Sequence, residues 1–83
     1  MSNIIIYSKQ VCPYCVQAKN LLKRKGVTKF LEIDITQGNN KEEMIKKSGG
    51  RMTVPQIFIN DQHIGGFDDL YALDKAGKLD EIL

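Results

Sequence analysis

Cys12-Pro13-Tyr14-Cys15 stands between an apolar run and the start of a helical pattern, and its two cysteines are the only ones in the chain. A thiol in the first turn of a helix lies near unpaired backbone N–H groups and the positive end of the helix dipole. Both favour the thiolate, which is the form that attacks disulfides. The short spacing lets the sulfurs reach each other, so the pattern predicts a dithiol that closes and reopens.

The sequence on either side of this tetrapeptide predicts a strand followed by a helix. Ile4-Ile5-Ile6-Tyr7 is continuously apolar, which is typical of a strand covered on both faces. Pro13 suits the first helical position, because the N–H that it lacks has no helical partner there. Apolar residues then recur at helical spacing through Leu22, and Gly26 ends the helix.

The middle of the chain predicts a second strand and a short helix. Apolar and charged residues alternate over 31–35, which indicates a half-exposed edge strand. Asn40 and Glu43 have the spacing of a capping box, so we expect a helix to begin at Asn40 and to stop at Gly49-Gly50.

The last third predicts a hairpin and a final helix. Two short apolar runs flank Asn60-Asp61, a pair typical of a tight turn. A helix over 67–75 should end at Gly77, and the apolar residues 79–83 should fold back onto the core. The order β-α-β-α-β-β-α predicts an α/β fold, a four-stranded mixed sheet with helices on both faces, in a single domain over 1–83.

Composition narrows the possible functions. A disulfide across so short a loop stabilises little, which leaves redox chemistry or metal binding for the cysteines. The net charge of +2 hides a basic half, +6 over 1–51, and an acidic half, −4 over 52–83, but no aromatic residues interleave with the bases to stack on nucleotides. No signal peptide and no membrane-spanning run is evident, so we expect a cytoplasmic protein that binds neither nucleic acid nor membrane.

Haem attachment and zinc binding by the cysteine pair have little support in the sequence. Covalent haem attachment requires His after the second Cys, where this chain has Val16. Structural zinc requires four ligands, and besides the cysteines the chain offers one His, His63, which the pattern places on the surface of the hairpin. We therefore expect no metal site within one chain; a cluster shared between two chains stays open.

Two further motifs suggest a binding site. In Thr53-Val54-Pro55, Val54 is extended because it precedes proline, and Pro55 either simply begins a strand or forms a cis bond. A cis bond would turn the Val54 backbone outward, towards an extended peptide. In Gly65-Gly66-Phe67-Asp68-Asp69, N–H groups at a helix start could bind a carboxylate and an aspartate could accept from an ammonium. Together they suit the head of an α-amino acid.

The three motifs, in this order and spacing, resemble those of the glutaredoxin family, specifically its small bacterial dithiol members, over essentially the whole chain. The resemblance implies the thioredoxin fold, with cis Pro55 beside the cysteines. It implies a glutathione-dependent oxidoreductase in which Cys12 attacks and Cys15 resolves, with glutathione as co-substrate and no tightly bound cofactor. The implied glutathione-binding residues are Lys9, Tyr14, Thr53, Val54, Pro55, Gly66, Phe67, Asp68 and Asp69, with Arg51 assisting.

The resemblance also implies partners and rivals. The expected partners are glutathione and glutathionylated or disulfide-containing proteins, and the expected state is a monomer. One rival is a redoxin reduced directly by thioredoxin reductase; the acidic pair after Gly-Gly and the Pro13-Tyr14 pair favour glutathione instead. The other is a dimeric iron–sulfur carrier, against which Pro13 argues because relatives that hold clusters mostly have a small residue there.

Overall fold

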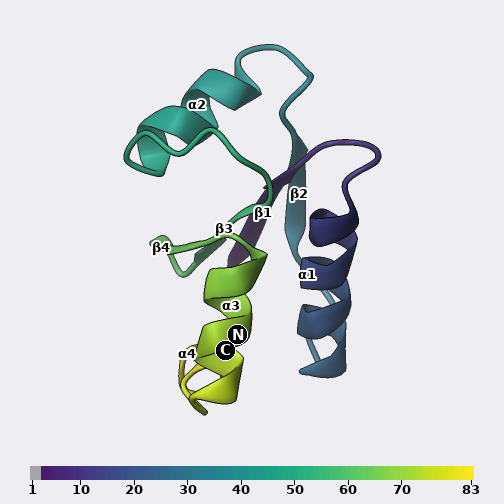
Figure 1. Ribbon diagram of the computed structural model, residues 1–83, viewed down its shortest axis with the longest axis vertical. Coiled ribbons are helices and arrows are strands. Elements are labelled where there is room, and N and C mark those ends of the chain that lie inside the picture. Colours follow the sequence, from purple (N-terminus) through teal and green to yellow (C-terminus); the bar gives the residue numbers. More distant parts are fainter. Residues whose placement is uncertain (1–2) are drawn as a thin grey trace.

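The computed structural model describes residues 3–83. Strands and helices follow in the expected order, and the structure adds a short helix near the end of the chain (Figure 1). The elements are β1 (Ile4–Ser8), α1 (Pro13–Arg24), β2 (Leu31–Asp34), α2 (Asn40–Lys47), β3 (Gln56–Ile59), β4 (Gln62–Gly65), α3 (Phe67–Lys75) and α4 (Leu79–Ile82).

The four strands form one mixed sheet in the order β2-β1-β3-β4. β1 pairs with β2 in parallel and with β3 antiparallel, and β3 pairs antiparallel with β4. This confirms the parallel crossover through α1 and the place of β2 at an edge. The hairpin turn is confirmed as well: Asn60 and Asp61 have φ of 51° and 68°, which a two-residue turn with the right twist requires.

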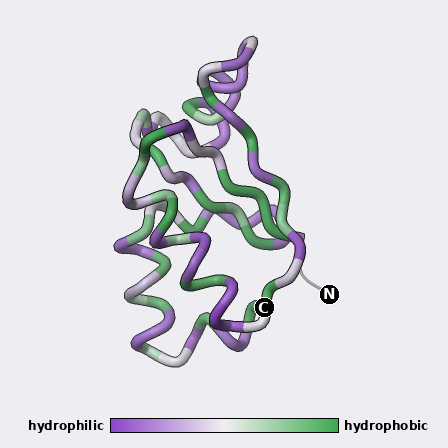
Figure 2. Tube along the Cα trace, turned by 90° about the vertical axis from the view of Figure 1, so that its right-hand side faces the viewer, coloured by the Kyte–Doolittle hydropathy of each residue, from purple (hydrophilic) through white to green (hydrophobic). Residues whose placement is uncertain are grey.

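Helices cover both faces of the sheet. Side chains along β1 and β3 alternate between the two faces, so each strand contributes to the packing on both. On one face Ile4 and Ile6 join the core with Leu22 of α1, Leu70 of α3 and Leu79 of α4. Figure 1 shows α1 and α3 together on this side and α2 apart from them, and in Figure 2 the apolar green follows the strands between the helices.

The other face carries a smaller cluster beneath α2. Tyr7 of β1 and Phe58 of β3 pack edge to face, with ring centroids 5.7 Å apart, and Met44 of α2 completes the buried set. The predicted architecture, a four-stranded mixed sheet between helices, is therefore confirmed. None of the helices in the described part of the chain is long and apolar enough to cross a membrane.

The predicted capping box of α2 is wrong. Asn39 precedes the helix as its N-cap without a side-chain bond, and Asn40 is the first helical residue. The Asn40 side chain instead donates from Nδ2 to the Asp34 carbonyl at 2.9 Å, which ties α2 to the end of β2. A tertiary partner thus replaces the local one that the sequence suggested. The predicted return of the C-terminal residues is confirmed, with Leu79 fully buried.

Candidate functional site

The cysteine pair lies where β1 ends and α1 begins. Cys12 is the N-cap of α1, with extended backbone, and Pro13 follows at the first helical position. The Cys12 sulfur accepts a hydrogen bond from the Cys15 N–H at 3.3 Å, which is the place a side-chain cap oxygen takes in most helices. The two sulfurs are joined as a disulfide, with Cα atoms 5.2 Å apart. The first turn of α1 therefore directs the Cys15 backbone N–H at the sulfur of Cys12.

The two cysteines differ in access. Cys12 keeps 9% of its surface exposed, whereas Cys15, one turn inside the helix, keeps 1%. An incoming disulfide therefore reaches the Cys12 sulfur first. The reduced pair has the asymmetry expected of one attacking and one resolving thiol.

The segment before β3 borders the Cys12 sulfur. The Val54-Pro55 peptide bond is cis, and the Val54 carbonyl oxygen lies 3.9 Å from the Cys12 sulfur. Within residues 3–83 no group hydrogen-bonds to the Val54 N–H. A stretch of backbone with an unused N–H donor thus lies directly beside the sulfur.

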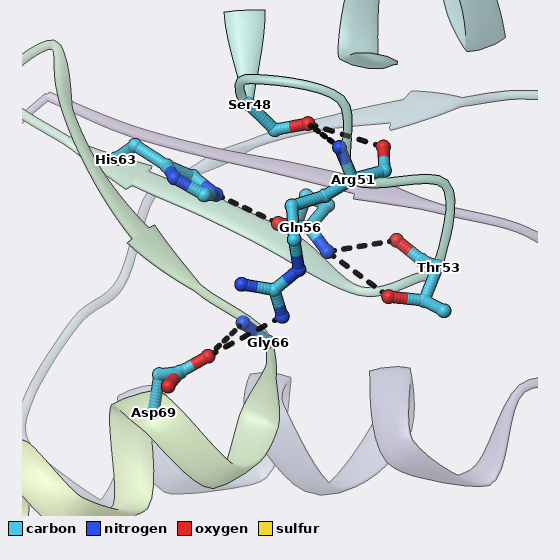
Figure 3. A network of polar contacts seen from close by, with 7 residues as sticks. All are labelled: Ser48, Arg51, Thr53, Gln56, His63, Gly66 and Asp69. Carbon is cyan, nitrogen blue, oxygen red and sulfur yellow. Dashed lines mark hydrogen bonds and ion pairs between the residues drawn. The ribbon is translucent and has the colours of Figure 1, made fainter.

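The start of α3 forms the next wall of the site. Gly66 is the N-cap, and its N–H donates to Asp69 Oδ2 at 2.9 Å. Arg51 Nη2 lies 3.5 Å from the same carboxylate oxygen. A Cβ placed on Gly66 would lie 3.4 Å from the Pro55 carbonyl oxygen, so the cis-proline segment and the start of α3 are neighbours. Figure 3 shows the Arg51 guanidinium reaching down to the Gly66 and Asp69 pair.

Aromatic side chains connect the two helices of the site. The rings of Tyr14 and Phe67 have centroids 6.2 Å apart, and Phe67 stacks on Tyr71 at 5.8 Å. Tyr14 keeps 57% of its surface exposed, so its ring forms an open apolar edge beside the cysteines. Asp68 is exposed in the first turn of α3.

Lys9 lies on the other side of the cysteines from the cis-proline segment's contacts, in a hollow of its own with them. It lines an open depression of about 580 Å³ next to both cysteines, together with Lys19 and Glu32. None of residues 53–55 or 66–69 lines this depression. The structure therefore places Lys9 beside both cysteines, in a hollow that the cis-proline segment and the start of α3 do not line.

Sequence reasoning missed Gln56 and placed His63 on the surface. Gln56 is fully buried in β3, and its Oε1 lies 2.7 Å from Nε2 of the half-buried His63. Burial, more than the nearby Arg51, lowers the pKa of His63 below its ordinary 6.5, while Asp69 opposes the shift, and the neutral imidazole is thereby favoured. A single polar residue in the otherwise apolar run Gln56–Ile59 was the signal available in the sequence.

Within the described residues, no three His, Cys, Asp or Glu side chains are grouped so that they could hold a metal ion. The Cys12 sulfur, at the start of α1, lies beside the Val54 backbone, and the Pro55 carbonyl lies next to the start of α3. Backbone N–H groups and carboxylates of this kind are the partners that a peptide with a carboxylate and an ammonium needs.

Comparisons with known proteins agree with this geometry. The sequence profile of the Glutaredoxin family matches residues 4–64. Glutaredoxin 3 of Escherichia coli K12 is 61% identical over all of this chain and 99% of its own length. A solution structure of glutaredoxin from Brucella melitensis is 52% identical, with a TM-score of 0.83 over 98% of this chain and 87% of that one. The crystal structure of a buckwheat glutaredoxin–glutathione complex, 29% identical, superposes with a TM-score of 0.88 over 99% and 76%.

Proposed function

The chain belongs to the glutaredoxin family, and we propose from that premise which of its residues bind glutathione and which react. The protein is a glutathione-dependent thiol–disulfide oxidoreductase, and its Cys12–Cys15 pair is the dithiol site. Its fold is the thioredoxin fold of its structural relatives.

Cys12 is the attacking thiol. Its thiolate attacks the glutathionyl sulfur of a mixed disulfide, forms a Cys12–glutathione disulfide and releases the substrate thiolate, which takes up a proton. The thiolate of a second glutathione then attacks the glutathionyl sulfur, so that oxidised glutathione leaves and the Cys12 thiolate returns. Exposure supports this assignment, because Cys12 is the more accessible sulfur and caps the helix.

Cys15 serves the reduction of protein disulfides. After Cys12 has attacked such a disulfide, the Cys15 thiolate displaces the second substrate thiol and closes the Cys12–Cys15 disulfide. Two glutathiones reopen it and become oxidised glutathione. The Cα separation of 5.2 Å supports this step, because it lies within the range that a disulfide spans.

Glutathione lies along the groove between the cis-proline segment and α3. The Val54 backbone beside the Cys12 sulfur pairs with the cysteinyl unit, and this proximity is the observation that carries the proposal. Gly66, Asp68 and Asp69 hold the γ-glutamyl end, where the start of α3 favours a carboxylate and an aspartate accepts from the ammonium. Tyr14, Thr53, Pro55 and Phe67 line the groove.

Lys9 neutralises the glycine carboxylate of glutathione, so the glycine end of the tripeptide lies beside the cysteines. Its position in the hollow beside Cys12 and Cys15 supports this placement. Arg51 adds charge at the γ-glutamyl end, since it already pairs with Asp69.

The test is a glutathione-coupled assay of a glutathionyl mixed disulfide with wild type, Cys12→Ser and Cys15→Ser. Cys12→Ser should lose all turnover. Cys15→Ser should keep it but lose the reduction of protein disulfides such as insulin. Full activity of Cys12→Ser, or turnover supported by thioredoxin reductase in place of glutathione, contradicts the assignment.

We also propose that the chain acts as a single-domain monomer in the cytoplasm, with glutathione as co-substrate and no resident cofactor. A dithiol that glutathione keeps reduced works in a reducing compartment, which supports this location. Size-exclusion chromatography after anaerobic purification tests the monomeric state and the lack of a coloured cofactor. A coloured dimer would instead support a shared iron–sulfur cluster.

A further inference from the structure

Gln56 is the one fully buried amide side chain among residues 3–83, and both ends of it are hydrogen-bonded. Its Nε2 donates to the Thr53 carbonyl at 2.9 Å and to Thr53 Oγ1 at 3.2 Å. Its Oε1 lies 2.7 Å from His63 Nε2. Figure 3 shows the amide between the two residues, with β3 supporting it and β4 supplying the histidine. Burying these polar groups costs free energy unless each one is hydrogen-bonded, so replacing one residue leaves its partner unpaired.

The chain of bonds has only one possible direction. The Thr53 carbonyl can only accept, so the Gln56 group that faces it must be the NH₂. Oε1 then faces His63, and because a carbonyl oxygen can only accept, His63 Nε2 must hold the hydrogen. The position of one backbone carbonyl therefore fixes both the orientation of the amide and the tautomer of the imidazole.

The bonds end at the segment that borders the reactive sulfur. Thr53 directly precedes Val54, whose carbonyl oxygen lies 3.9 Å from the Cys12 sulfur. Thr53 and its neighbour Met52 are exposed, and neither belongs to a strand or helix. Arg51 directly precedes Met52 and is held by Ser48. The Ser48 Oγ accepts from the Arg51 N–H and donates to the Arg51 carbonyl, each at 3.1 Å. Ser48, at the end of α2, thus holds the exposed turn at Arg51, and Gln56 of β3 holds it at Thr53.

We propose that Gln56 and His63 are positioning residues for the glutathionyl group. His63 orients the Gln56 amide, the amide holds the Thr53 carbonyl, and the Val54 edge is thereby presented in the geometry that pairs with the cysteinyl unit. Neither residue touches the substrate or the sulfur. This inference rests on the proposed pairing of Val54 with glutathione.

A positioning role and a purely structural role predict different changes in the kinetics. Loss of positioning weakens binding of the glutathionyl group in the ground state and the transition state alike, which raises KM and leaves kcat nearly unchanged. Reduction of a small disulfide without a glutathionyl group, by the pre-reduced Cys12–Cys15 dithiol, does not use the Val54 pairing. A general loss of structure would lower both activities.

The first experiment compares wild type with His63→Phe, which keeps a ring against Phe58 (centroids now 4.9 Å apart) but has no Nε2–H. We expect KM for a glutathionylated peptide to rise about three- to tenfold, as for the loss of one hydrogen bond, with kcat within about twofold. Gln56→Met, which removes the amide, should have the same effect. Gln62→Ala is the matched control, because Gln62 is exposed on the same strand as His63.

An unchanged KM in folded His63→Phe overturns the inference, and so does an equal loss of the glutathione-free reaction. If wild type itself shows no glutathione-dependent turnover, the proposed function fails instead, so the two failures are distinguishable.

The second experiment needs no variant. Two-bond ¹H–¹⁵N correlation spectra of wild type report which ring nitrogen of His63 holds the hydrogen. We expect the Nε2–H tautomer alone at pH 7 in the free and the glutathionylated protein. The Nδ1–H tautomer, or a mixture of the two, overturns the inference even if the variants fail to fold.

Discussion

At the scale of single residues, the site depends on groups that serve two purposes at once. The Cys12 sulfur caps α1 and is the proposed nucleophile, and the Asp69 carboxylate caps α3 and pairs with Arg51. A helix end needs a capping acceptor whether or not a ligand is bound. The protein therefore holds its reactive groups in place before any substrate arrives.

Asp69→Asn separates the two roles of that residue. The amide oxygen can still accept from the Gly66 N–H, so the helix should remain capped, but the charge that faces Arg51 and the ligand ammonium is lost. We expect KM for a glutathionylated peptide to rise about threefold or more, with a smaller difference from wild type at high salt. Steady-state kinetics at low and high ionic strength measures this.

Asp61→Asn is the control for Asp69→Asn, because it makes the same chemical change in the hairpin turn, where asparagine tolerates the positive φ equally well. Its KM should equal that of wild type. Equal effects of the two substitutions would show that net charge, not position, is responsible.

At the scale of elements, polar side chains join strands and helices around the site. Glu32 of β2 accepts from Ser8 of β1 at 2.6 Å and pairs with Lys19 of α1 at 2.9 Å. Gly65, at the end of β4, allows the chain to turn into α3 with φ of 117°. These contacts set how α1 and α3 lie on the same face of the sheet.

Gly65→Ala should strongly destabilise the protein. Its backbone lies in the left-handed region, and a Cβ there would collide with the Asp69 carboxylate that caps α3. Gly49→Ala is the matched control, since Gly49 also has positive φ (72°) but no atom near the added Cβ. In urea unfolding we expect Gly49→Ala to cost about 1 kcal/mol and Gly65→Ala clearly more.

The excess cost of Gly65→Ala should shrink when Asp69 is already alanine, because the colliding group is then absent. An excess that persists in the Asp69→Ala background would place its cause elsewhere.

Glu32→Gln should lower stability in a pH-dependent way. The hydrogen bond from Ser8, followed by that from Lys19, lowers the pKa of Glu32 below its ordinary 4.5. Because the folded-state pKa is the lower one, this stabilisation is present above pH 4.5 and is lost as pH falls through the folded-state pKa. The stability difference between Glu32→Gln and wild type, measured by urea unfolding, should therefore be present at pH 7 and shrink below pH 4.5.

Glu42→Gln is the control for this experiment, because Glu42 is exposed and makes no side-chain hydrogen bond or ion pair among residues 3–83. Its stability difference from wild type should stay small at every pH. A Glu32→Gln difference that does not change with pH would contradict the ionic origin.

At the scale of the whole molecule, two clusters on opposite faces of one sheet hold the site together. β1 contributes to both, with Ile6 on the face of α1 and α3 and Tyr7 on the face of α2. The dithiol follows β1, and the cis-proline segment precedes its neighbour β3. Packing on the two faces holds β1 against β3 and therefore positions Cys12 relative to Val54.

Leu22→Ala and Met44→Ala, one on each face, should each cost about 2–5 kcal/mol, because both side chains are fully buried. Both variants should unfold in a single transition, seen alike by far-UV circular dichroism and tyrosine fluorescence. Leu31→Ala, at a position 56% exposed, should change stability by about 0.5 kcal/mol or less. Two separate transitions would show that the faces fold independently.

The sequence by itself determined the order of elements, the hairpin turn and the dithiol at the start of α1. These features depend on local rules: apolar periodicity, proline at a first helical position, a two-residue turn with positive φ, and sulfurs three positions apart. The motif resemblance indicated the family, which the comparisons confirmed. The roles of the individual binding residues stay predictions.

Only the tertiary structure decided which residues meet across the sheet. Asn40 caps nothing because Asp34 lies within its reach, and His63 is paired because Gln56 of the adjacent strand is buried beside it. Lys9 lines a hollow apart from the cis-proline segment, although it stands three residues before Cys12. Such partners lie far apart along the chain or compete with local ones, and their choice depends on packing that local sequence patterns do not contain.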